Sequence, residues 1–352
     1  MTVGTEGATA AQALWFAAPN VAELREADVV APRANEVTVE AVASLVSLGS
    51  ELTILRGLVP PDQEVRPRTV EGSFAFPIKY GYQVVGRITA AGAKSGFEVG
   101  DTVFARHPHQ SSFTLAVDWD DPPLVFKLPA YENLEMAVFA NLLDVSVNAL
   151  LDVPVRVGDV VAVFGHGAVG MFCAQLARRT AAAVVVVDPS PRRRRLALDL
   201  GADFAVDPVD AAAAIDEASE GRGVDIAIEA SGAPAALQQA IRTTGMEGTV
   251  VVVGFYGDKP VPLVLSPEFH LDRQRLISSM TRALNPVLRS RWDLSRRMRV
   301  SLRLLPELYR PDFVSHRIPF ERAPEAYALA DAASDDVVGI VFTYGTSDSS
   351  AL

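Results

Sequence analysis

A glycine-rich segment in the middle of the chain has the residue types and spacing of a dinucleotide site. Residues 165–170 match the pattern G-x-G-x-x-G. In that pattern the first glycine permits a tight turn, the second lets a pyrophosphate approach the backbone, and the third lets helix and strand pack closely. The N–H groups that begin the next helix attract phosphate. We therefore predict that the cofactor is bound by Gly165, His166, Gly167, Ala168, Val169 and Gly170, with His166 near the pyrophosphate and not catalytic.

An acidic residue follows this loop at the spacing of a ribose ligand. Asp188 stands eighteen positions after Gly170, where about 20 are expected. Its carboxylate accepts ribose hydroxyls and repels a 2′-phosphate, so it favours NAD. The alternative is a turn-forming aspartate before Pro189. Arg192 and Arg193 lie just beyond and could hold a 2′-phosphate, which keeps NADP open.

Alternating strands and helices must position these residues. A continuous apolar run leads into the loop, as in a strand buried on both faces, and helical periodicity follows at once. This alternation predicts a doubly wound parallel sheet. The expected strands are 160–164, 184–187, 225–229 and 249–253, and the expected helices are 169–177, 191–200 and 235–242.

The regions before and after this alternating segment show a different sequence pattern. Residues 36–43, 82–88 and 102–105 are strand candidates separated by glycine-containing turns, as in a compact β domain. From about residue 283 the pattern becomes helical and basic, and it ends in a strand-like segment at 337–344. The basic runs 192–195 and 296–299 are expected on the solvated faces of helices.

Composition excludes several classes of function. A formal charge of −11 argues against nucleic acid as a partner. The single cysteine, Cys173, excludes an intrachain disulfide and a cysteine-built zinc site. Residues 1–18 lack the pattern of a signal peptide and no run is long enough to span a membrane, which predicts a cytoplasmic protein without a membrane partner.

Several short motifs also occur in a characteristic order. They are Gly49-Ser50-Glu51-Leu52 with Gly57, Gly81-Tyr82-Gln83-Val84-Val85-Gly86, Val99-Gly100-Asp101-Thr102-Val103, the glycine loop, Leu200-Gly201-Ala202-Asp203, Val224-Asp225 through Glu229-Ala230-Ser231-Gly232, and Gly248 to Gly254. In this order they resemble the medium-chain dehydrogenase/reductase superfamily over residues 35–343.

The resemblance implies an α/β protein with two domains. A GroES-like β-barrel catalytic domain would comprise residues 1–145 and 284–352, and a Rossmann domain with a doubly wound parallel sheet would comprise residues 146–283. It further implies cofactor contacts from Ser231 and Gly254, and a homodimer paired through the region 254–281.

Departures from the zinc-dependent members of the superfamily fall at the metal ligands. Leu48 stands where they have a cysteine, Tyr82 where they have a histidine, and Gln83 where they have a glutamate. The third ligand position falls near Asn141, and the four-cysteine structural lobe is absent. Leucine cannot bind zinc, and a neutral phenol or amide binds it poorly. We therefore expect no zinc. Residues 47–51 also resemble the S-x-G-T-E segment of a subgroup that includes bacteriochlorophyllide a dehydrogenase.

Without zinc, another group must protonate the alkoxide that hydride transfer creates. The resemblance implies Tyr82 as the acid, Ser50 as a relay hydroxyl, and Asn141 or Asp144 as groups that orient substrate. The alternatives are that Tyr82 only fills the space of the metal and that Ser50 only caps a turn or helix. His107 and His109 would point the same way on a strand, as substrate-facing groups, or they belong to a solvated loop.

Three hypotheses of function follow. The first is a zinc-independent NAD(H)-dependent dehydrogenase or ketoreductase of a polar secondary alcohol such as a sugar, cyclitol or specialised metabolite. The second is a zinc-free NADPH-dependent enoyl or quinone reductase, which reduces a polarised C=C bond. The third is a non-catalytic dinucleotide-binding sensor.

Overall fold

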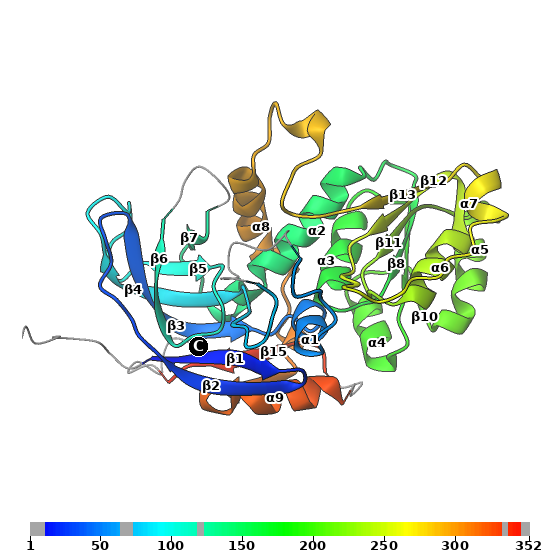
Figure 1. Cartoon of the computed structure of the whole chain (residues 1–352). Helices are drawn as coiled ribbons and strands as arrows, with labels where there is room; N and C mark the ends of the chain where they lie inside the picture. The colour runs from blue at the N-terminus through cyan, green and yellow to red at the C-terminus, as the bar shows by residue number, and fades with distance from the viewer. Residues whose placement is uncertain (1–10, 64–72, 118–122, 333–336, 346–352) are drawn as a thin grey trace, which may run out of the picture. The chain divides into compact units, whose positions relative to one another are not determined.

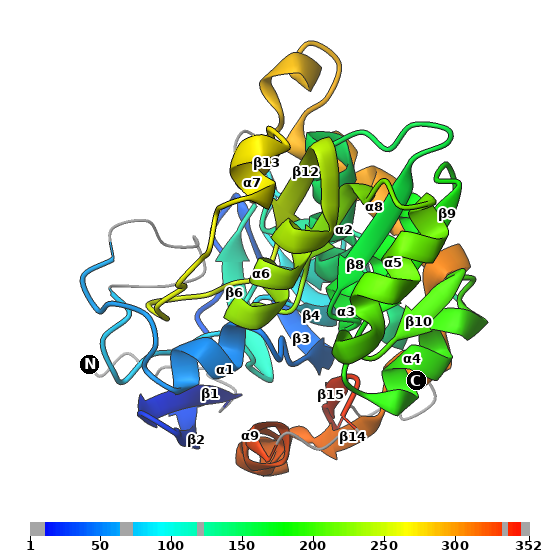
Figure 2. The same cartoon turned by 90° about the vertical axis from the view of Figure 1, so that its right-hand side faces the viewer.

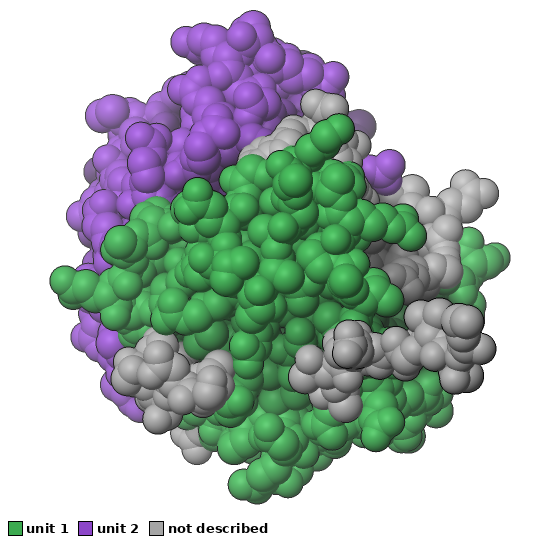
Figure 3. Space-filling view, turned by 90° about the vertical axis from the view of Figure 1, so that its left-hand side faces the viewer, with its two compact units in different colours: residues 1–140, 314–352 green, residues 141–313 purple. Residues whose placement is uncertain are grey.

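The computed structural model describes residues 11–63, 73–117, 123–332 and 337–345, so most of the segment 1–18 discussed above lies outside it. The chain divides into two units, coloured separately in Figure 3: unit 1 holds residues 1–140 and 314–352, and unit 2 holds residues 141–313. The sequence placed these divisions after residues 145 and 283. Unit 2 ends at residue 313 and not at 283. The additional residues 284–313 include α8 (Leu294–Leu308), which an ion pair joins to α2 (Ala140–Asp152).

Unit 1 is built on a mostly antiparallel sheet of seven strands. Strands β14, β15, β3, β4, β5 and β7 follow one another across it, and β6 also pairs with β3. Strands β1 (Ala11–Ala18) and β2 (Val21–Ala27) form a separate hairpin. The sheet strands are β3 (Glu36–Leu45), β4 (Val84–Ala91), β5 (Thr102–Ala105), β6 (Ser112–Ala116), β7 (Val125–Lys127), β14 (His316–Pro319) and β15 (Ile340–Thr343).

The core of unit 1 lies on one face of this sheet. Val37, Val39 and Ala41 of β3 all point into it because side chains two positions apart share a face. Helix α9 (Ala323–Asp331) adds Ala326 and Tyr327 to the same core. The remaining helices of the unit are short: α1 (Ser50–Leu55), η1 (Glu135–Phe139) and η5 (Phe320–Arg322).

Unit 2 is built on a parallel sheet (Figure 1). Its strand order is β10-β9-β8-β11-β12-β13. Every neighbouring pair in it is parallel. The strands are β8 (Val160–Phe164), β9 (Ala183–Val187), β10 (Phe204–Val206), β11 (Val224–Glu229), β12 (Thr244–Val252) and β13 (Arg275–Ser278). This order is that of a Rossmann fold, in which a dinucleotide binds at the carboxyl edge where the order reverses, here between β8 and β11.

Helices cover both faces of the parallel sheet (Figure 2). Helices α5 (Ala211–Ser219) and α6 (Pro234–Thr243) pack on one face. Helices α2, α3 (Ala168–Ala177) and α4 (Pro191–Asp199) pack on the other. The shorter helices are η2 (Pro208–Asp210), α7 (Glu268–Leu271), η3 (Pro286–Leu288) and η4 (Pro311–Phe313). In the described part of the chain, no helix is long and apolar enough to cross a membrane.

Candidate active site

The glycine loop joins β8 to α3 in the geometry that its glycines require. Gly165 has a φ of 91°, and a Cβ added there would lie 2.7 Å from the Cβ of Ser231. A Cβ on Gly170 would lie 1.9 Å from the carbonyl oxygen of Gly165. Gly167 is the N-cap of α3 and supplies no side-chain hydrogen bond, and a Cβ there would meet no atom within 4 Å. The first N–H groups of α3 therefore have no side-chain acceptor at the N-cap, and the space beside Gly167 is open, as a bound pyrophosphate requires.

Asp188 directly follows β9, and the backbone holds its carboxylate in place. Its Oδ2 accepts a hydrogen bond from the His166 N–H at 2.7 Å, and its Oδ1 accepts one from the Ser190 N–H at 2.9 Å. Each carboxylate oxygen can accept a second hydrogen bond, so the carboxylate retains capacity for ribose hydroxyls. The guanidinium of Arg193 lies 3.8 Å from Oδ2. The residues of loop and strand end therefore fit the adenosine half of a nicotinamide dinucleotide.

His166 lies inside the loop as a buried imidazole. Neither ring nitrogen has a hydrogen-bond partner of ordinary geometry. Burial lowers the pKa of its side chain to about 4, so the ring is neutral at pH 7. Its side chain therefore brings no positive charge to the loop.

Ser231 and Gly254, the two further predicted cofactor contacts, both adjoin Glu229 at the end of β11. Ser231 donates hydrogen bonds to Glu229 Oε1 from its N–H at 2.7 Å and from its hydroxyl at 2.5 Å. The N–H of Gly254 donates to the backbone oxygen of Glu229 at 3.0 Å. The sequence prediction missed Glu229, although a carboxylate that ends an apolar strand is a visible signal.

In unit 1, the structure brings Tyr82 and Ser50 together and adds Ser47. The hydroxyl of Tyr82 donates a hydrogen bond to Ser47 Oγ at 2.5 Å and lies 3.3 Å from Ser50 Oγ. Burial raises the pKa of Tyr82 above its ordinary value, and these hydrogen bonds only partly oppose that shift, so the hydroxyl stays protonated at neutral pH. Gly49 and not Ser50 is the N-cap of α1, without a side-chain bond. We call Tyr82, Ser47 and Ser50 the hydroxyl cluster.

A buried carboxylate lies at the start of α1, next in sequence to the cluster. Glu51 Oε2 accepts a hydrogen bond from the Tyr327 hydroxyl at 2.5 Å and lies 3.1 Å from His109 Nε2. Its Oε1 accepts from the Ser47 N–H at 2.8 Å. His109 Nδ1 in turn lies 2.7 Å from the Ser44 hydroxyl. Glu51 therefore orients the backbone that carries one hydroxyl of the cluster.

The expectation that His107 and His109 lie on a strand is wrong, and the alternative of a solvated loop fits His107 but not His109. Residues 106–109 are not in a strand. His107 stacks on Phe113 with ring centroids 3.7 Å apart, whereas His109 is fully buried against Glu51. His109 is therefore not solvated.

The residues at the expected metal positions do not fit zinc. Leu48, Tyr82 and Asn141 offer an alkyl group, a protonated phenol and an amide, where zinc prefers thiolate, imidazole or carboxylate. The phenol is already hydrogen-bonded to Ser47. Among the residues that the structure describes, no three His, Cys, Asp or Glu side chains are grouped to hold a metal ion.

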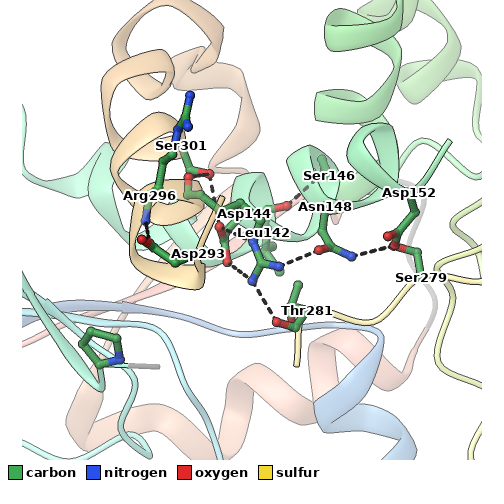
Figure 4. A network of polar contacts seen from close by, with 12 residues as sticks. Leu142, Asp144, Ser146, Asn148, Asp152, Ser279, Thr281, Asp293, Arg296 and Ser301 are labelled. Carbon is green, nitrogen blue, oxygen red and sulfur yellow. Dashed lines mark hydrogen bonds and ion pairs between the residues drawn. The ribbon is translucent and has the colours of Figure 1, made fainter. Parts of the chain in front are cut away.

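Asp144 binds a buried arginine in unit 2 (Figure 4). Its carboxylate oxygens accept hydrogen bonds from Nε and Nη2 of Arg297, each at 2.9 Å. Arg297 also donates to Asn148 at 2.5 Å and to the carbonyl of Thr281 at 2.8 Å. These contacts hold Asp144 in place within unit 2. They also correct the expectation that residues 296–299 are all solvated, because Arg297 is 1% exposed. Asn141, one turn earlier on α2, is buried as well.

Comparison with known proteins identifies the family. Residues 168–295 match the family described as zinc-binding dehydrogenase. D-guloside 3-dehydrogenase of Shigella flexneri is 30% identical over 331 residues, which cover 88% of this chain and 93% of that protein. The chain belongs to this family of medium-chain dehydrogenases/reductases. It is accordingly an oxidoreductase of the dehydrogenase type.

Solved structures of the family have the same fold. The 2R,3R-butanediol dehydrogenase of Bacillus subtilis superposes with a TM-score of 0.75 at 21% identity, over 95% of this chain and 99% of that one. A zinc-binding dehydrogenase of Sinorhizobium meliloti 1021, bound to NADP, superposes with a TM-score of 0.76 at 20% identity and the same coverage. The predicted fold class, a GroES-like domain with a Rossmann domain, is confirmed.

Proposed function

We propose that this family member transfers hydride between NAD(H) and a polar secondary alcohol or its ketone without zinc. The observation that carries the proposal is the hydroxyl cluster, in which Tyr82 stands where zinc-dependent relatives are expected to have a histidine ligand. The relative named D-guloside 3-dehydrogenase supports a sugar-like substrate; a cyclitol or a specialised metabolite belongs to the same class. The resemblance to the bacteriochlorophyllide a dehydrogenase subgroup is consistent with this chemistry.

The hydroxyl cluster supplies a proton to the carbonyl oxygen of the substrate, which a zinc ion would stabilise by its positive charge. When bound, the nicotinamide cofactor provides the hydride for the carbonyl carbon. Tyr82 donates its phenolic proton to the carbonyl oxygen as the alkoxide forms, and it recovers a proton through Ser47 or Ser50. A donor of this kind contributes about 2.7–4 kcal/mol to the transition state. In alcohol oxidation the same groups accept the proton.

Asp188 supports NAD as the cofactor, because a 2′-phosphate would meet its buried carboxylate. Arg193 beside it, and the NADP in the Sinorhizobium structure, favour the second candidate function, an NADPH-dependent enoyl or quinone reductase. A non-catalytic sensor would bind dinucleotide without turnover.

The proposal includes a homodimer whose only other partner is a small molecule. Among the described strands, β13 is an edge of the parallel sheet and pairs with β12 alone, and its Leu276 is 38% exposed. Such an edge is suited to pairing across a two-fold axis. We expect a cytoplasmic protein that binds neither nucleic acid nor membranes.

The decisive experiment combines cofactor binding with turnover by the metal-stripped protein. Chelator-treated protein, verified free of zinc by elemental analysis, is titrated with NADH and NADPH and then assayed with glycosides, cyclitols and enones. We expect tighter NADH binding, and oxidation of a secondary hydroxyl that added zinc does not increase. Activity that appears only with zinc refutes zinc independence, enone reduction with NADPH favours the second candidate, and binding without turnover favours the sensor.

Tyr82→Phe tests the acid within the same assay. Loss of the phenolic proton should lower kcat about 10²- to 10³-fold. Tyr131→Phe is the matched control because Tyr131 lies in unit 1 outside the hydroxyl cluster. Unchanged turnover by Tyr82→Phe removes this residue from the mechanism.

A further inference from the structure

The carboxylate of Glu229 occupies the point where the strand order of the parallel sheet reverses. It ends β11, which pairs with β8, so it is a neighbour of the glycine loop that follows β8. A Cβ on Gly165 would clash with Ser231, so the segments that follow β8 and β11 lie close together. Glu229 is fully buried. Burying a carboxylate in this way is costly unless hydrogen bonds satisfy it.

Four hydrogen bonds from two separate loops satisfy this carboxylate. Oε1 accepts the two bonds from Ser231 and one from the Gly232 N–H at 2.9 Å, all from the loop after β11. Oε2 accepts one from the Tyr256 hydroxyl at 2.8 Å, from the loop after β12. A Cβ on Gly254 would lie 2.5 Å from Oε2, so the second loop passes directly against the carboxylate.

Lys259 joins the same two loops a second time. Its ammonium donates a hydrogen bond to the carbonyl oxygen of Gly232 at 2.9 Å and lies 5.7 Å from the ring centroid of Tyr256. The loops after β11 and β12 are therefore connected both by Tyr256 to Glu229 and by Lys259 to Gly232. Neither connection is needed to form the strands, which pair through their own backbones.

We propose that Glu229, Tyr256 and Lys259 form a latch that positions the nicotinamide half of the cofactor. The reason is the order of strands along the carboxyl edge. Asp188 at β9 takes the adenosine ribose and the loop after β8 takes the pyrophosphate, so the rest of the dinucleotide extends over β11 and β12. The latch sets the distance between the two loops there. This inference rests on the proposed use of a nicotinamide dinucleotide and adds three positioning residues to it.

The test compares two ligands that share the adenosine half. The full chain is titrated with NADH, followed by its fluorescence, and with ADP-ribose, which lacks nicotinamide, followed by calorimetry. Tyr256→Phe removes one hydrogen bond to a carboxylate, and bonds of that kind are worth about a tenfold factor or more. We expect the Kd of NADH to rise about tenfold and that of ADP-ribose to change less than about twofold.

Substitutions at Glu229 separate geometry from charge. Glu229→Gln keeps an oxygen for Ser231 and Gly232 and an amide that donates to the Tyr256 hydroxyl, so it should bind NADH as the wild type does, whereas Glu229→Ala should weaken it as Tyr256→Phe does. Glu247→Gln is the control, an exposed carboxylate in the same unit whose partner is Arg273. Thermal unfolding of each variant reports on the fold.

The outcomes distinguish the latch from the cofactor assignment. Equal weakening of NADH and ADP-ribose by Tyr256→Phe, or no change in either, overturns the latch while the wild type still binds NADH. Weak binding by Glu229→Gln with a normal unfolding temperature also overturns it, because the charge and not the geometry would then matter. Failure of the wild-type protein to bind NADH or NADPH overturns the proposed function itself.

Discussion

Replacing Arg297 with alanine should destabilise unit 2 more than any surface substitution. The change removes both donors that lie 2.9 Å from the carboxylate of Asp144 and leaves that carboxylate buried without the positive charge of its ion pair. Removing one partner of a buried ion pair costs about 3–5 kcal/mol. The bonds to Asn148 and Thr281 are lost as well, so we expect a value at the upper end of that range.

Chemical labelling of the Cys173 thiol can measure the loss of stability in unit 2. Cys173 is the one cysteine of the chain and is buried on the α3 side of the parallel sheet. Burial raises the pKa of the thiol to about 12, so it reacts with a labelling reagent only when the unit opens. Labelling for a fixed short time across a urea series gives the free energy of opening for wild type and variant.

Two further variants test whether the ion pair between Arg297 and Asp144 holds α8 to α2. Arg299→Ala removes an exposed arginine from the same helix and should change the free energy by no more than about 0.5 kcal/mol. Arg297→Met combined with Asp144→Leu removes both charges and should restore most of the loss. If Arg297→Ala lies within about 1 kcal/mol of wild type, or the double variant is as unstable as the single one, the pair does not hold α8 to α2.

Three other predictions use single substitutions. Because burial lowers the pKa of His166 from 6.5 to about 4, the unfolded chain binds the extra proton between these values, and the free energy of unfolding should fall as the pH drops from 6.5 toward 4. The fall in the free energy of unfolding over this pH range is about 3 kcal/mol. His166→Gln should abolish this pH dependence, as measured by thiol labelling. A pH dependence that the substitution leaves unchanged would mean that the ring is not buried and neutral. Asp188→Ser should shift the ratio of NADPH to NADH affinity at least about tenfold toward NADPH, and an unaltered ratio in fluorescence titrations would mean that this carboxylate does not meet the ribose. Leu276→Lys should give a monomer by light scattering, whereas Leu198→Lys on α4 should not; a dimer that survives the first change is not paired through β13.

The parallel sheet and its cofactor edge could be predicted because their signals are local. The run 160–164 is apolar at every position, and all five residues are buried in β8. Gly165 and Asp188 then follow at the ends of neighbouring strands, where chain order alone places them at one edge. A strand, a tight turn and a helix start each depend on residues within a few positions.

Features that depend on distant partners could not be predicted in this way. Arg297 looks like part of a solvated basic run, and its burial follows from Asp144, 153 positions earlier. His109 is buried because Glu51 and Ser44, more than 50 positions away, supply its hydrogen bonds. The β1–β2 hairpin was missed for a different reason. β1 is apolar at nearly every position and shows no alternation, so only the Pro19-Asn20 pair signals a turn.

The pairing of β15 with β3 has a consequence for the order of events during synthesis. β3 ends at Leu45, and β15, which pairs with its last residues, begins only at Ile340. A ribosome that adds about 5–20 residues per second needs on the order of 15–60 s to cover that interval. All described strands of unit 2 emerge within it, so the parallel sheet can fold on the nascent chain while residues 43–45 of β3 still lack their neighbours in β15. Until β15 is made, the backbone groups of residues 43–45 on that side of β3 have no strand to pair with.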